Sequence, residues 1–528
     1  MRADERWASI PAMVQDNGER YGNREAVVDG ARRATYSDLA DRALAATRAV
    51  MAAGIAPGDR VSVWAPNSVD FVVTALGILG AGAWLVPVNT RFKGDEAAYV
   101  LRKSGARLLF TVGDFLGTDY AGMLAAADRE LARSIQIVLL AGTTRGQADT
   151  LASFLDAKGA VADSAARARI AGIHGGDVAD IMFTSGTTGR PKGALITHEQ
   201  SLRAFEAWGA GFGIRERDRA LIVPPFFHCF GYKAGWMLCL MAGATALPVA
   251  VFEPGDALRA IERERVSVLT GPPTLWTAIL DHPAKDSTDL SSLRLAFVGA
   301  ASVPEPLIRR MLAELPVERV STGYGLTESS AMCSITRRDD PPDVISTWNA
   351  GHPIDGVEVR LVDDAGHDVE VGAPGELLIR GYNVMRGYYD DADATADAID
   401  PDGWLHTGDV AVANEQGALR IVDRKKDIYI VGGFNVSPAE VEAALLGDER
   451  VAEVAVVGVP DERMGEVGAA FVVPRPGVAL SADDLLVFAR EHVANYKVPR
   501  HVEIVDTLPL NASGKVLKTV LRERMAGR

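Results

Sequence analysis

The sequence predicts an α/β protein with a large N-terminal domain and a small C-terminal one. Before Gly351, short apolar runs alternate with segments of helical period, which is typical of βαβ units around a parallel sheet. After Gly351 the apolar runs are joined by Gly, Asp and Pro residues, which favours a small antiparallel barrel. From Asp423 the chain becomes charged and then alternates shorter strands and helices, as an α+β domain would.

Two series of βαβ units are expected in the large domain. The first lies between Arg60 and Leu140, with apolar runs at 61–64, 84–88, 107–112 and 135–140. The second lies between Ile181 and Gly325, with an amphipathic segment over 256–266 and apolar runs at 181–184, 220–224, 245–251, 266–270, 293–299 and 318–325. We expect each series to form one subdomain, and the two subdomains to stack.

The remaining elements belong to the barrel and to the C-terminal domain. Residues 357–381 are predicted to be barrel strands joined by a turn. The tail is predicted to contain helices over 437–447 and 481–493 and strands at 428–431, 451–459, 469–474 and 502–505. These elements suffice for an independent domain. We therefore divide the chain into an N-terminal domain over 1–425 and a C-terminal domain over 426–528.

Composition narrows the possible partners. The chain has 528 residues, 48% hydrophobic and 24% charged, which is the balance of a globular protein with several packed cores. Its formal net charge of -15, with no long basic block, makes nucleic acid and anionic lipid unfavourable partners. A phosphate-rich ligand would need a local site of backbone N–H groups, a few cations and a metal.

Several features predict a cytoplasmic protein. The chain has three cysteines, Cys229, Cys239 and Cys333, and an odd number in a long chain favours a reducing compartment. Its first residues carry charges where a signal peptide needs an apolar run. Two uncharged stretches, 71–88 and 235–252, approach the length of a membrane span, but Gly and Pro interrupt both. We interpret each as a buried helix followed by a buried strand, with no transmembrane segment.

A loop of small, hydroxylated residues follows the apolar run at 181–184. Residues 181–193 have the sequence IMFTSGTTGRPKG. Glycines let backbone N–H groups converge on a phosphate, hydroxyls add donors, and a nearby cation balances charge. The Walker sequence has Gly-Lys-Ser/Thr running directly into a helix, whereas here Pro191 separates Arg190 from Lys192. The loop therefore predicts phosphate binding of a kind other than the P-loop.

Further motifs follow the phosphate loop in a fixed order. They are FFHCFGY at 226–232, VGAASVP at 298–304, STGYGLTES at 321–329, GELLIRG at 375–381, GWLHTGD at 403–409, RIVDRKKD at 420–427, GGFNVSPAEVE at 432–442 and LNASGK at 510–515. Together with TSGTTGRPKG they resemble the signature of the adenylate-forming superfamily. This family includes acyl-CoA synthetases, aryl-CoA ligases, beetle luciferases and the adenylation domains of peptide synthetases. The resemblance covers nearly the whole chain.

The resemblance implies a two-step reaction. The family activates a carboxylic acid with ATP and Mg²⁺ as an acyl-adenylate, and its acyl-CoA synthetases then transfer the acyl group to the thiol of coenzyme A. Joining a carboxylate to the α-phosphorus of ATP brings two anions together, so the site must neutralise charge and align the attack. The expected cofactors are ATP, Mg²⁺ and coenzyme A, and the expected partners are small molecules. Whether the chain forms a homodimer is left open.

The resemblance also assigns the nucleotide site. Thr184 and Glu328 would bind Mg²⁺, a hard cation that prefers oxygen ligands. Tyr324 would stack on adenine, while Asp409 would accept hydrogen bonds from the ribose hydroxyls with support from Arg424. The other residues implied to line the nucleotide are Ser185, Gly186, Thr187, Thr188, Lys192, Ala300, Ala301, Gly323, Gly325 and Thr327.

Two lysines of the C-terminal domain are implied to govern catalysis. Lys515, which follows the motif residues that neighbouring Lys518 lacks, would bring its ammonium to the carboxylate and the α-phosphate during adenylation. The C-terminal domain of the family is mobile and swings about a residue that corresponds to Lys426. After the swing, the segment 428–433, with Gly432 and Gly433, would form a tunnel for the pantetheine arm of coenzyme A.

The acyl site is implied to lie around the FFHCFGY motif. His228 would orient or screen the carboxylate as a gate more than as a proton-transfer base. Relatives that activate amino acids carry an Asp directly after this position, whereas this chain has Cys229, which disfavours an α-amino acid. The pocket residues are expected to be Phe230, Lys233, Ala234 and Met332. A cation here is costly, so Lys233 either has an acidic partner, which we favour, or meets a polar group of the substrate.

The neighbourhood of His228 narrows the resemblance further. The stretches 224–235 and 271–304 look most like bacterial fatty-acid-CoA-ligase-type enzymes acting on the propanoate chain of the bicyclic indane-dione of steroid degradation. Neighbouring subfamilies use medium-chain or aryl acids with the same catalytic motifs. Two alternatives stay open: transfer of the acyl group to a carrier protein, and a catalytically silent nucleotide sensor. A silent relic would be expected to lack Lys515 or Glu328, and both are present.

Overall fold

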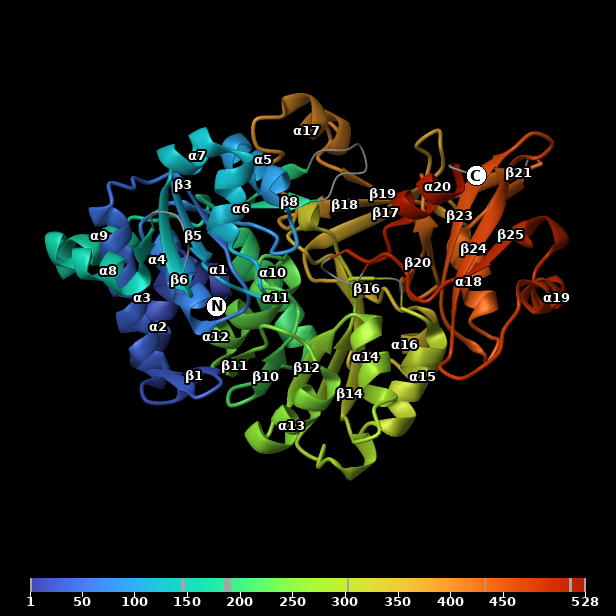
Figure 1. The fold of residues 1–528 in the computed structure, drawn as a ribbon, viewed down its shortest axis with the longest axis horizontal. Helices are drawn as coiled ribbons and strands as arrows, with labels where there is room; N and C mark the ends of the chain where they lie inside the picture. The colour runs from blue at the N-terminus through green and yellow to red at the C-terminus, as the bar shows by residue number, and fades with distance from the viewer. Residues whose placement is uncertain are drawn as a thin grey trace.

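The fold is that of a large α/β domain followed by a smaller α+β domain, in a computed structural model (Figure 1). The structure describes residues 2–143, 148–184, 191–301, 303–432, 434–511 and 515–526. Four sheets account for the strands in these ranges, two of them large and mainly parallel and two smaller and mainly antiparallel. The predicted fold class is confirmed.

The first large sheet has seven strands in the order β7-β6-β5-β3-β4-β8-β9. Its strands are β3 (Arg60–Trp64), β4 (Trp84–Pro87), β5 (Leu108–Val112), β6 (Gln136–Ala141), β7 (Asp149–Thr150), β8 (Val178–Thr184) and β9 (Lys192–Thr197). All neighbours are parallel except the hairpin of β8 and β9. The expectation that residues 181–184 open the second series is wrong, because β8 pairs with β4 of the first sheet.

The second large sheet has nine strands in the order β16-β15-β14-β13-β12-β10-β11-β1-β2. They are β1 (Glu25–Asp29), β2 (Arg32–Thr35), β10 (Arg219–Ile222), β11 (Thr245–Pro248), β12 (Val268–Gly271), β13 (Leu295–Val298), β14 (Arg319–Tyr324), β15 (Ser334–Ile335) and β16 (His352–Pro353). The parallel strands β10 to β14 are those of the predicted second series. The N-terminal hairpin of β1 and β2, which the sequence pattern did not reveal, extends the sheet beyond β11.

Helices fill the space between the two sheets and cover their outer faces (Figure 1). Those of the large domain are α1 (Ala3–Arg6), α2 (Ile10–Tyr21), α3 (Tyr36–Ala52), α4 (Val69–Gly80), α5 (Gly94–Ser104), α6 (Tyr120–Ala127), α7 (Arg129–Ser134), α8 (Leu151–Asp156), α9 (Asp163–Ala171), α10 (His198–Phe212), α11 (Cys229–Gly231), α12 (Leu238–Ala242), α13 (Pro254–Glu264), α14 (Pro273–Leu280), α15 (Glu305–Glu314), α16 (Pro342–Thr347) and α17 (Ala392–Ala398). A π-helix, η2 (Tyr232–Met237), joins α11 to α12.

One hydrophobic core holds the two sheets together. It combines apolar side chains of both sheets with the fully buried Trp64, Trp208 and Trp236. A second core lies between the second sheet and α13, α14 and α15. The two uncharged stretches belong to these cores: 71–88 contains most of α4 and all of β4, and 235–252 contains α12 and β11. None of the helices in the described ranges combines the length and the apolar character needed to cross a lipid bilayer.

The antiparallel unit after Gly351, predicted as a small barrel, is an open four-stranded sheet, since its two outer strands, both described in full, pair with their inner neighbours and not with each other. It consists of β17 (Val357–Val362), β18 (Gly375–Gly381), β19 (Leu405–Ala413) and β20 (Leu419–Arg424), paired in sequence order. Apolar residues of β18, β19 and β20 join the main core. This packing fixes β19 and β20, and with them Asp409 in the middle of β19 and Arg424 at the end of β20, relative to the large sheets.

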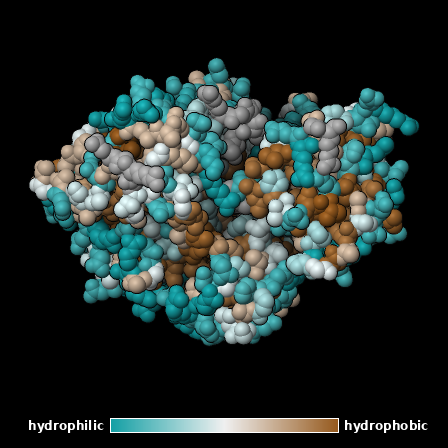
Figure 2. Space-filling model, in the orientation of Figure 1, coloured by the Kyte–Doolittle hydropathy of each residue, from teal (hydrophilic) through white to brown (hydrophobic). Residues whose placement is uncertain are grey.

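The C-terminal domain has hydrophobic cores of its own on both faces of its sheet. Its elements are β21 (Tyr429–Val431), β22 (Phe434–Val436), α18 (Pro438–Leu445), β23 (Val451–Asp461), β24 (Gly465–Pro474), α19 (Ala482–His492), β25 (His501–Ile504) and α20 (Lys518–Ala526). A furrow separates this domain from the large one, and hydrophobic residues lie on both sides of it (Figure 2).

Candidate active site

A series of contacts that starts at the β8–β9 hairpin connects the two predicted magnesium ligands, Thr184 and Glu328. Thr184 lies opposite Lys192 in the hairpin, and its hydroxyl donates a hydrogen bond to the Lys192 carbonyl at 3.4 Å. The Lys192 ammonium lies 5.1 Å from the centre of the Tyr388 ring. The Tyr388 hydroxyl in turn donates to Glu328 Oε1 at 2.8 Å. The contact between Lys192 and Tyr388 therefore links Thr184 to Glu328.

These oxygen donors fit Mg²⁺. A hydroxyl and a carboxylate are hard ligands, and Mg²⁺ often takes only one or two protein carboxylates because substrate phosphates and waters complete its shell. Glu328 is held at the main chain as well, since the Met385 N–H donates to its carbonyl at 2.8 Å. The other predicted phosphate-loop residues, Ser185, Gly186, Thr187 and Thr188, lie outside the described residues, as does Gly433.

Three residues from three separate motifs meet in a second cluster. The Tyr324 hydroxyl donates to Asp409 Oδ2 at 2.5 Å, and Arg424 Nε lies 3.0 Å from Asp409 Oδ1. β19 and β20 pair Asp409 directly opposite Arg424. Burial and the Asp409 carboxylate raise the pKa of Tyr324 well above its usual value, so the phenol stays protonated and donates. The cluster fixes the tyrosine ring and leaves the carboxylate able to accept further hydrogen bonds.

The backbone around Tyr324 is shaped by close approaches. A Cβ at Gly323 would lie 2.6 Å from the Ser334 carbonyl oxygen, and one at Gly325 would lie 2.2 Å from the Ala331 carbonyl oxygen. Only glycine fits at these two positions. Ala300 has a φ of 66°, in the left-handed region that an alanine rarely adopts. Such strain clusters at functional sites, and Ala300 and its neighbour Ala301 follow β13 after Gly299.

Two more predicted nucleotide residues are placed by short elements. Thr327 opens the single 3₁₀ turn Thr327–Ser329 that also carries Glu328, so the threonine and the carboxylate share one rigid turn. Gly432 lies at the turn between β21 and β22 in the C-terminal domain, and its N–H donates to the Met464 carbonyl at 2.8 Å. In the segment predicted to form the pantetheine tunnel, Ile430 is 51% accessible to solvent in this orientation, whereas Tyr429 and Val431 are buried in the core of the C-terminal domain.

Lys515 lies where the C-terminal tail faces the large domain. Arg91 Nη1 donates to the Asn511 carbonyl at 3.5 Å, which ties the tail to the loop after β4. The Lys515 N–H donates to Asn511 Oδ1 at 2.8 Å. Its side chain keeps contact with solvent, yet partial desolvation between the domains and the Arg424 charge lower the pKa of Lys515 to about 8, against the opposing effect of Asp409. The tail lysine and the Tyr324–Asp409–Arg424 cluster thus belong to one electrostatic environment.

The predicted hinge residue lies between two anchored neighbours. Lys425 Nζ contacts Asp364 Oδ1 at 2.9 Å and Glu376 Oε2 at 3.1 Å, both in the large domain. Asp427 Oδ1 accepts from Arg522 of α20 at 2.6 Å. Lys426, between them, has a pKa lowered by partial burial and by nearby Arg424. Ion pairs therefore tie the two sides of Lys426 to different domains.

His228 begins the segment of the predicted acyl site. It caps α11, since the Phe230 N–H donates to His228 Nδ1 at 3.2 Å. Burial lowers the pKa of His228 to about 4, so the ring is neutral at pH 7. A neutral ring suits the predicted gate. Its action during catalysis stays a prediction.

The other predicted acyl-site residues join the main core. Phe230, Ala234 and Met332 are at most 9% exposed and belong to the same apolar cluster. Lys233 differs: its side chain is fully enclosed, and its ammonium lies 3.0 Å from Asp180 Oδ1. Of the two alternatives for Lys233, the structure thus shows the acidic partner, and the lysine does not face open space as a substrate ligand would.

Three residues around the site escaped the sequence analysis. Tyr388 holds Glu328, and Asp180 pairs with Lys233. Asn67, directly before α4, receives the Phe226 N–H on its Oδ1 at 2.7 Å and donates to the carbonyls of Ile222 and Pro224. Each acts on a partner far away in the sequence. The only available signal was that Asp180 is a charged residue within a buried strand.

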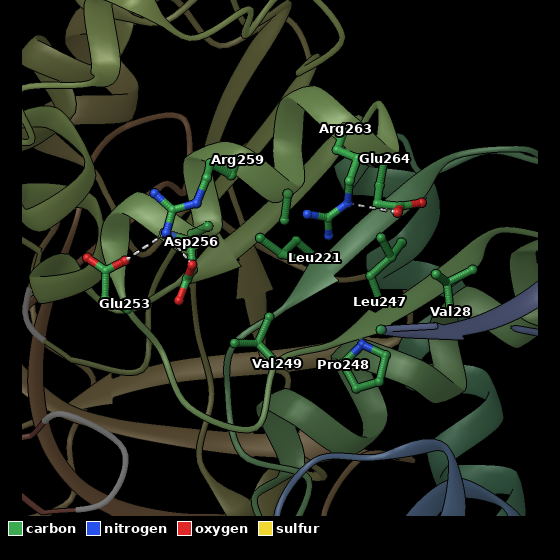
Figure 3. A pocket seen from close by; sticks show the side chains of 13 residues that line it. Val28, Leu221, Leu247, Pro248, Val249, Glu253, Asp256, Arg259, Arg263 and Glu264 are labelled. Atoms are coloured by element: carbon green, nitrogen blue, oxygen red, sulfur yellow. Dashed lines mark hydrogen bonds and ion pairs between the residues drawn. The ribbon is translucent and has the colours of Figure 1, made fainter. Parts of the chain in front are cut away.

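A separate surface pocket of about 240 Å³ lies away from these residues (Figure 3). Its apolar floor includes Val28, Leu221 and Leu247, and α13 forms its charged rim. The rim residues pair among themselves: Arg259 contacts Glu253 and Asp256, and Arg263 contacts Glu264. None of the predicted site residues lines this pocket.

Comparisons with known proteins agree with this geometry. The sequence pattern of the AMP-binding enzyme family matches residues 14–389, and that of the AMP-binding enzyme C-terminal domain matches residues 440–515. The 3-[(3aS,4S,7aS)-7a-methyl-1,5-dioxo-octahydro-1H-inden-4-yl]propanoyl:CoA ligase of Mycobacterium tuberculosis is 48% identical over 98% of both chains. The enzyme of that name from Rhodococcus jostii is 46% identical, again over 98% of both.

Solved structures show the same relationship. The anthranilate CoA ligase AuaEII in complex with anthranoyl-AMP superposes with a TM-score of 0.88 at 27% identity, covering 100% of both chains. The chain therefore belongs to the AMP-binding enzyme family and, within it, to the acid–thiol ligases that use ATP to join a carboxylic acid to coenzyme A.

Proposed function

We propose that the acid is the propanoate side chain of a bicyclic indane-dione, converted to its coenzyme A thioester with release of AMP and pyrophosphate. The observation that carries this proposal is that two relatives with 48% and 46% identity over nearly the full length bear the name of this ligase. Cys229, where an acidic residue would pair with an amino group, supports an acid without an α-amino group. The mainly apolar setting of Phe230, Ala234 and Met332 suits a carbocyclic substrate.

In the first step, the carboxylate must meet the α-phosphate of ATP. Thr184 and Glu328 would hold Mg²⁺, and Tyr388 orients the Glu328 carboxylate for that purpose. Bound Mg²⁺ supplies charge neutralisation on the phosphate oxygens. Lys192 contributes a cation beside the phosphate loop. We assign the loop residues Ser185, Gly186, Thr187 and Thr188 to the phosphates on sequence grounds.

Recognition of the nucleoside falls to the second cluster. Asp409 has free acceptor capacity beyond its bonds to Tyr324 and Arg424, so it can accept from the two ribose hydroxyls. Tyr324 is fixed at its hydroxyl, which presents its ring face for stacking on adenine. The backbone close to the base would come from Ala300, Ala301, Gly323, Gly325 and Thr327.

Lys515 would stabilise the negative charge that develops between carboxylate and α-phosphate. It must then leave, because the thiol of coenzyme A needs access to the same carbonyl carbon. Rotation about Lys426 would exchange it for the segment with Gly432 and Gly433, while His228 would screen the acyl carbonyl between the two steps. The three buried free cysteines support a reducing compartment, which we take to be the cytoplasm.

An acid panel tests the substrate. The purified enzyme is given ATP, Mg²⁺ and coenzyme A with the bicyclic dione propanoate, octanoate or ferulate, and kcat/KM is measured by pyrophosphate release while thioester is measured by mass. We expect the bicyclic acid to lead by about 10²-fold or more. Preference for octanoate or ferulate would refute the substrate. Pyrophosphate release without thioester would favour a carrier-protein acceptor, and no release with any acid would favour a nucleotide sensor.

A further inference from the structure

The ion pair between Lys233 and Asp180 is the most deeply enclosed pair of opposite charges in the described part of the chain. Both side chains have no solvent exposure. The Lys233 ammonium also donates to Ser201 Oγ at 2.9 Å, and Ser201 passes a hydrogen bond to the Thr197 carbonyl at 3.0 Å. Removing two charges from water is costly, and apolar residues of similar volume often stabilise a fold as well or better. Stability alone therefore does not explain the pair.

The two partners belong to different layers of the molecule. Lys233 lies on the π-helix η2, which follows from the second sheet, whereas Asp180 lies on β8 of the first sheet. Asp180 precedes Thr184 by four residues, or about 13 Å along a strand. The phosphate loop begins at Thr184. The pair thus joins the acyl-site segment to the strand that carries the phosphate loop.

The π-helix itself needs an anchor. A π-helix holds one residue more than an α-helix in the same turn and is frequently found at functional sites. Within η2, Gly235 has non-helical dihedral angles, with φ −95° and ψ −106°. Relaxation toward α-helical geometry would rotate the side chains before this kink by about one residue, or roughly 100°. Phe230 and Ala234 would then turn away from their present positions.

The start of the same segment is already fixed. Asn67, also from the first layer, makes three hydrogen bonds to the backbone between Ile222 and Phe226. With that end held, the Lys233–Asp180 pair controls the other end. His228, Phe230 and Ala234 lie in the span between the two anchors or directly at the second one.

We propose that Asp180 and Lys233 are positioning residues whose ion pair holds the acyl-site segment against β8, and so sets where the substrate carboxylate lies relative to the α-phosphate. This rests on the proposed role of the segment as the acyl site. It does not depend on which acid is used, so the test employs whichever acid the wild-type enzyme prefers.

The test removes both charges together. In Lys233→Met/Asp180→Val neither partner leaves an unpaired buried charge, so the melting temperature stays within a few degrees of the wild-type value. We expect kcat for pyrophosphate release to fall about 30-fold and KM for the acid to rise, with KM for ATP unchanged, since small misplacement of reacting groups is costly. Hydrogen–deuterium exchange over residues 226–237 should become faster, which is measurable without any substrate.

A second buried pair provides the matched control. Arg294 and Asp218 are 11% and 4% exposed. Asp218 directly precedes β10 and Arg294 directly precedes β13, so both lie at the strand ends opposite to the acyl-site segment. Arg294→Met/Asp218→Val should leave kcat and KM for the acid unchanged, whatever its melting temperature. If Lys233→Met/Asp180→Val does not fold, Lys233→Gln/Asp180→Asn, which keeps polar side chains of similar shape and leaves no unpaired charge, should show the same split at about 10-fold.

Wild-type kinetics together with wild-type exchange in the charge-free variant would overturn the proposal. The proposal would also be overturned if kcat fell, KM for ATP rose and the melting temperature dropped together, because that pattern indicates general destabilisation. If the acid panel shows that another acid is preferred, the bicyclic acid is refuted as the substrate. The role of the ion pair is then tested by comparing kcat and KM of the variant and the wild type on that preferred acid.

Discussion

At the scale of single residues, the role proposed for Lys515 gives the most specific prediction. Its ammonium is expected to act only while the carboxylate attacks ATP. Lys515→Ala should therefore slow pyrophosphate release by at least about 10²-fold and leave thioester formation from a supplied acyl-adenylate within a few fold of wild type. Lys518→Ala is the control, because Lys518 pairs with Glu442 inside the C-terminal domain. Equal loss of both half-reactions in the Lys515 variant would refute its role.

The lowered pKa of Lys515 predicts a pH dependence. Protonated lysine is the active form, so kcat/KM for ATP, which reports the free enzyme, should fall as pH rises through about 8. In Lys515→Arg, this fall in kcat/KM should shift to higher pH, because the guanidinium stays charged. Unfolding would not explain the loss: a folded pKa below the unfolded value of 10.5 makes this group favour the folded state more as pH rises from about 8 to 10.5. A flat profile up to pH 10 would contradict the assignment.

Tyr388 is expected to strengthen the binding of Mg²⁺. Its hydroxyl orients Glu328, and loss of such a partner typically costs at least tenfold in metal affinity. We expect Tyr388→Phe to raise the Mg²⁺ concentration for half-maximal adenylation about 10-fold. Tyr389→Phe serves as the control, since Tyr389 instead packs edge-on against Trp84. An unchanged Mg²⁺ titration for Tyr388→Phe would mean that Glu328 needs no such support.

At the scale of elements, the turn between β20 and β21 is expected to govern the change between half-reactions. Lys425 is tied to the large domain and Asp427 to α20, which leaves Lys426 as the residue that can rotate. Lys426→Pro fixes φ at this position. We expect adenylation to stay within about threefold of wild type while thioester formation falls about 10²-fold. Lys426→Ala should behave like the wild type in both steps. Loss of adenylation alone would place the pivot elsewhere.

The β8 strand shows how far local pattern determines elements. The apolar run at 181–184 correctly indicates a buried strand, because local composition decides whether a segment is extended. It does not indicate which sheet the strand joins, and β8 pairs with β4 of the first sheet. Likewise β1 and β2 were missed, since EAVVD and RRAT are short and carry charges. Their place is decided by β11, more than 200 residues away in the sequence.

The whole molecule is expected to switch between two domain orientations. Arg475 of the C-terminal domain lies 3.9 Å from Asp281 of the large domain, and both side chains are exposed. Spin labels at Asp281→Cys and Arg475→Cys should report a short distance with ATP. A non-reactive acyl-adenylate analogue plus coenzyme A should add a second, longer population in double electron–electron resonance.

The native cysteines do not interfere with this labelling. Cys229, Cys239 and Cys333 are buried, and burial raises the pKa of each thiol, for Cys229 and Cys333 to about 12. Labels at Asp281 and Glu305, both in the large domain, should give the same distance in every state. A single unchanged distance for the interdomain pair under all ligands would contradict domain rotation.

The sequence by itself determined the fold class, the family, the order of the motifs and the residue types expected to meet ATP, because these follow from local periodicity and from short motifs whose chemistry needs a fixed spacing. Only the tertiary structure decided what brings those motifs together: Tyr324 to Asp409, Tyr388 to Glu328, Lys233 to Asp180. The physical reason is that a buried hydroxyl or charge must find a partner wherever packing delivers one. That choice depends on the arrangement of whole sheets, which no local stretch of sequence contains.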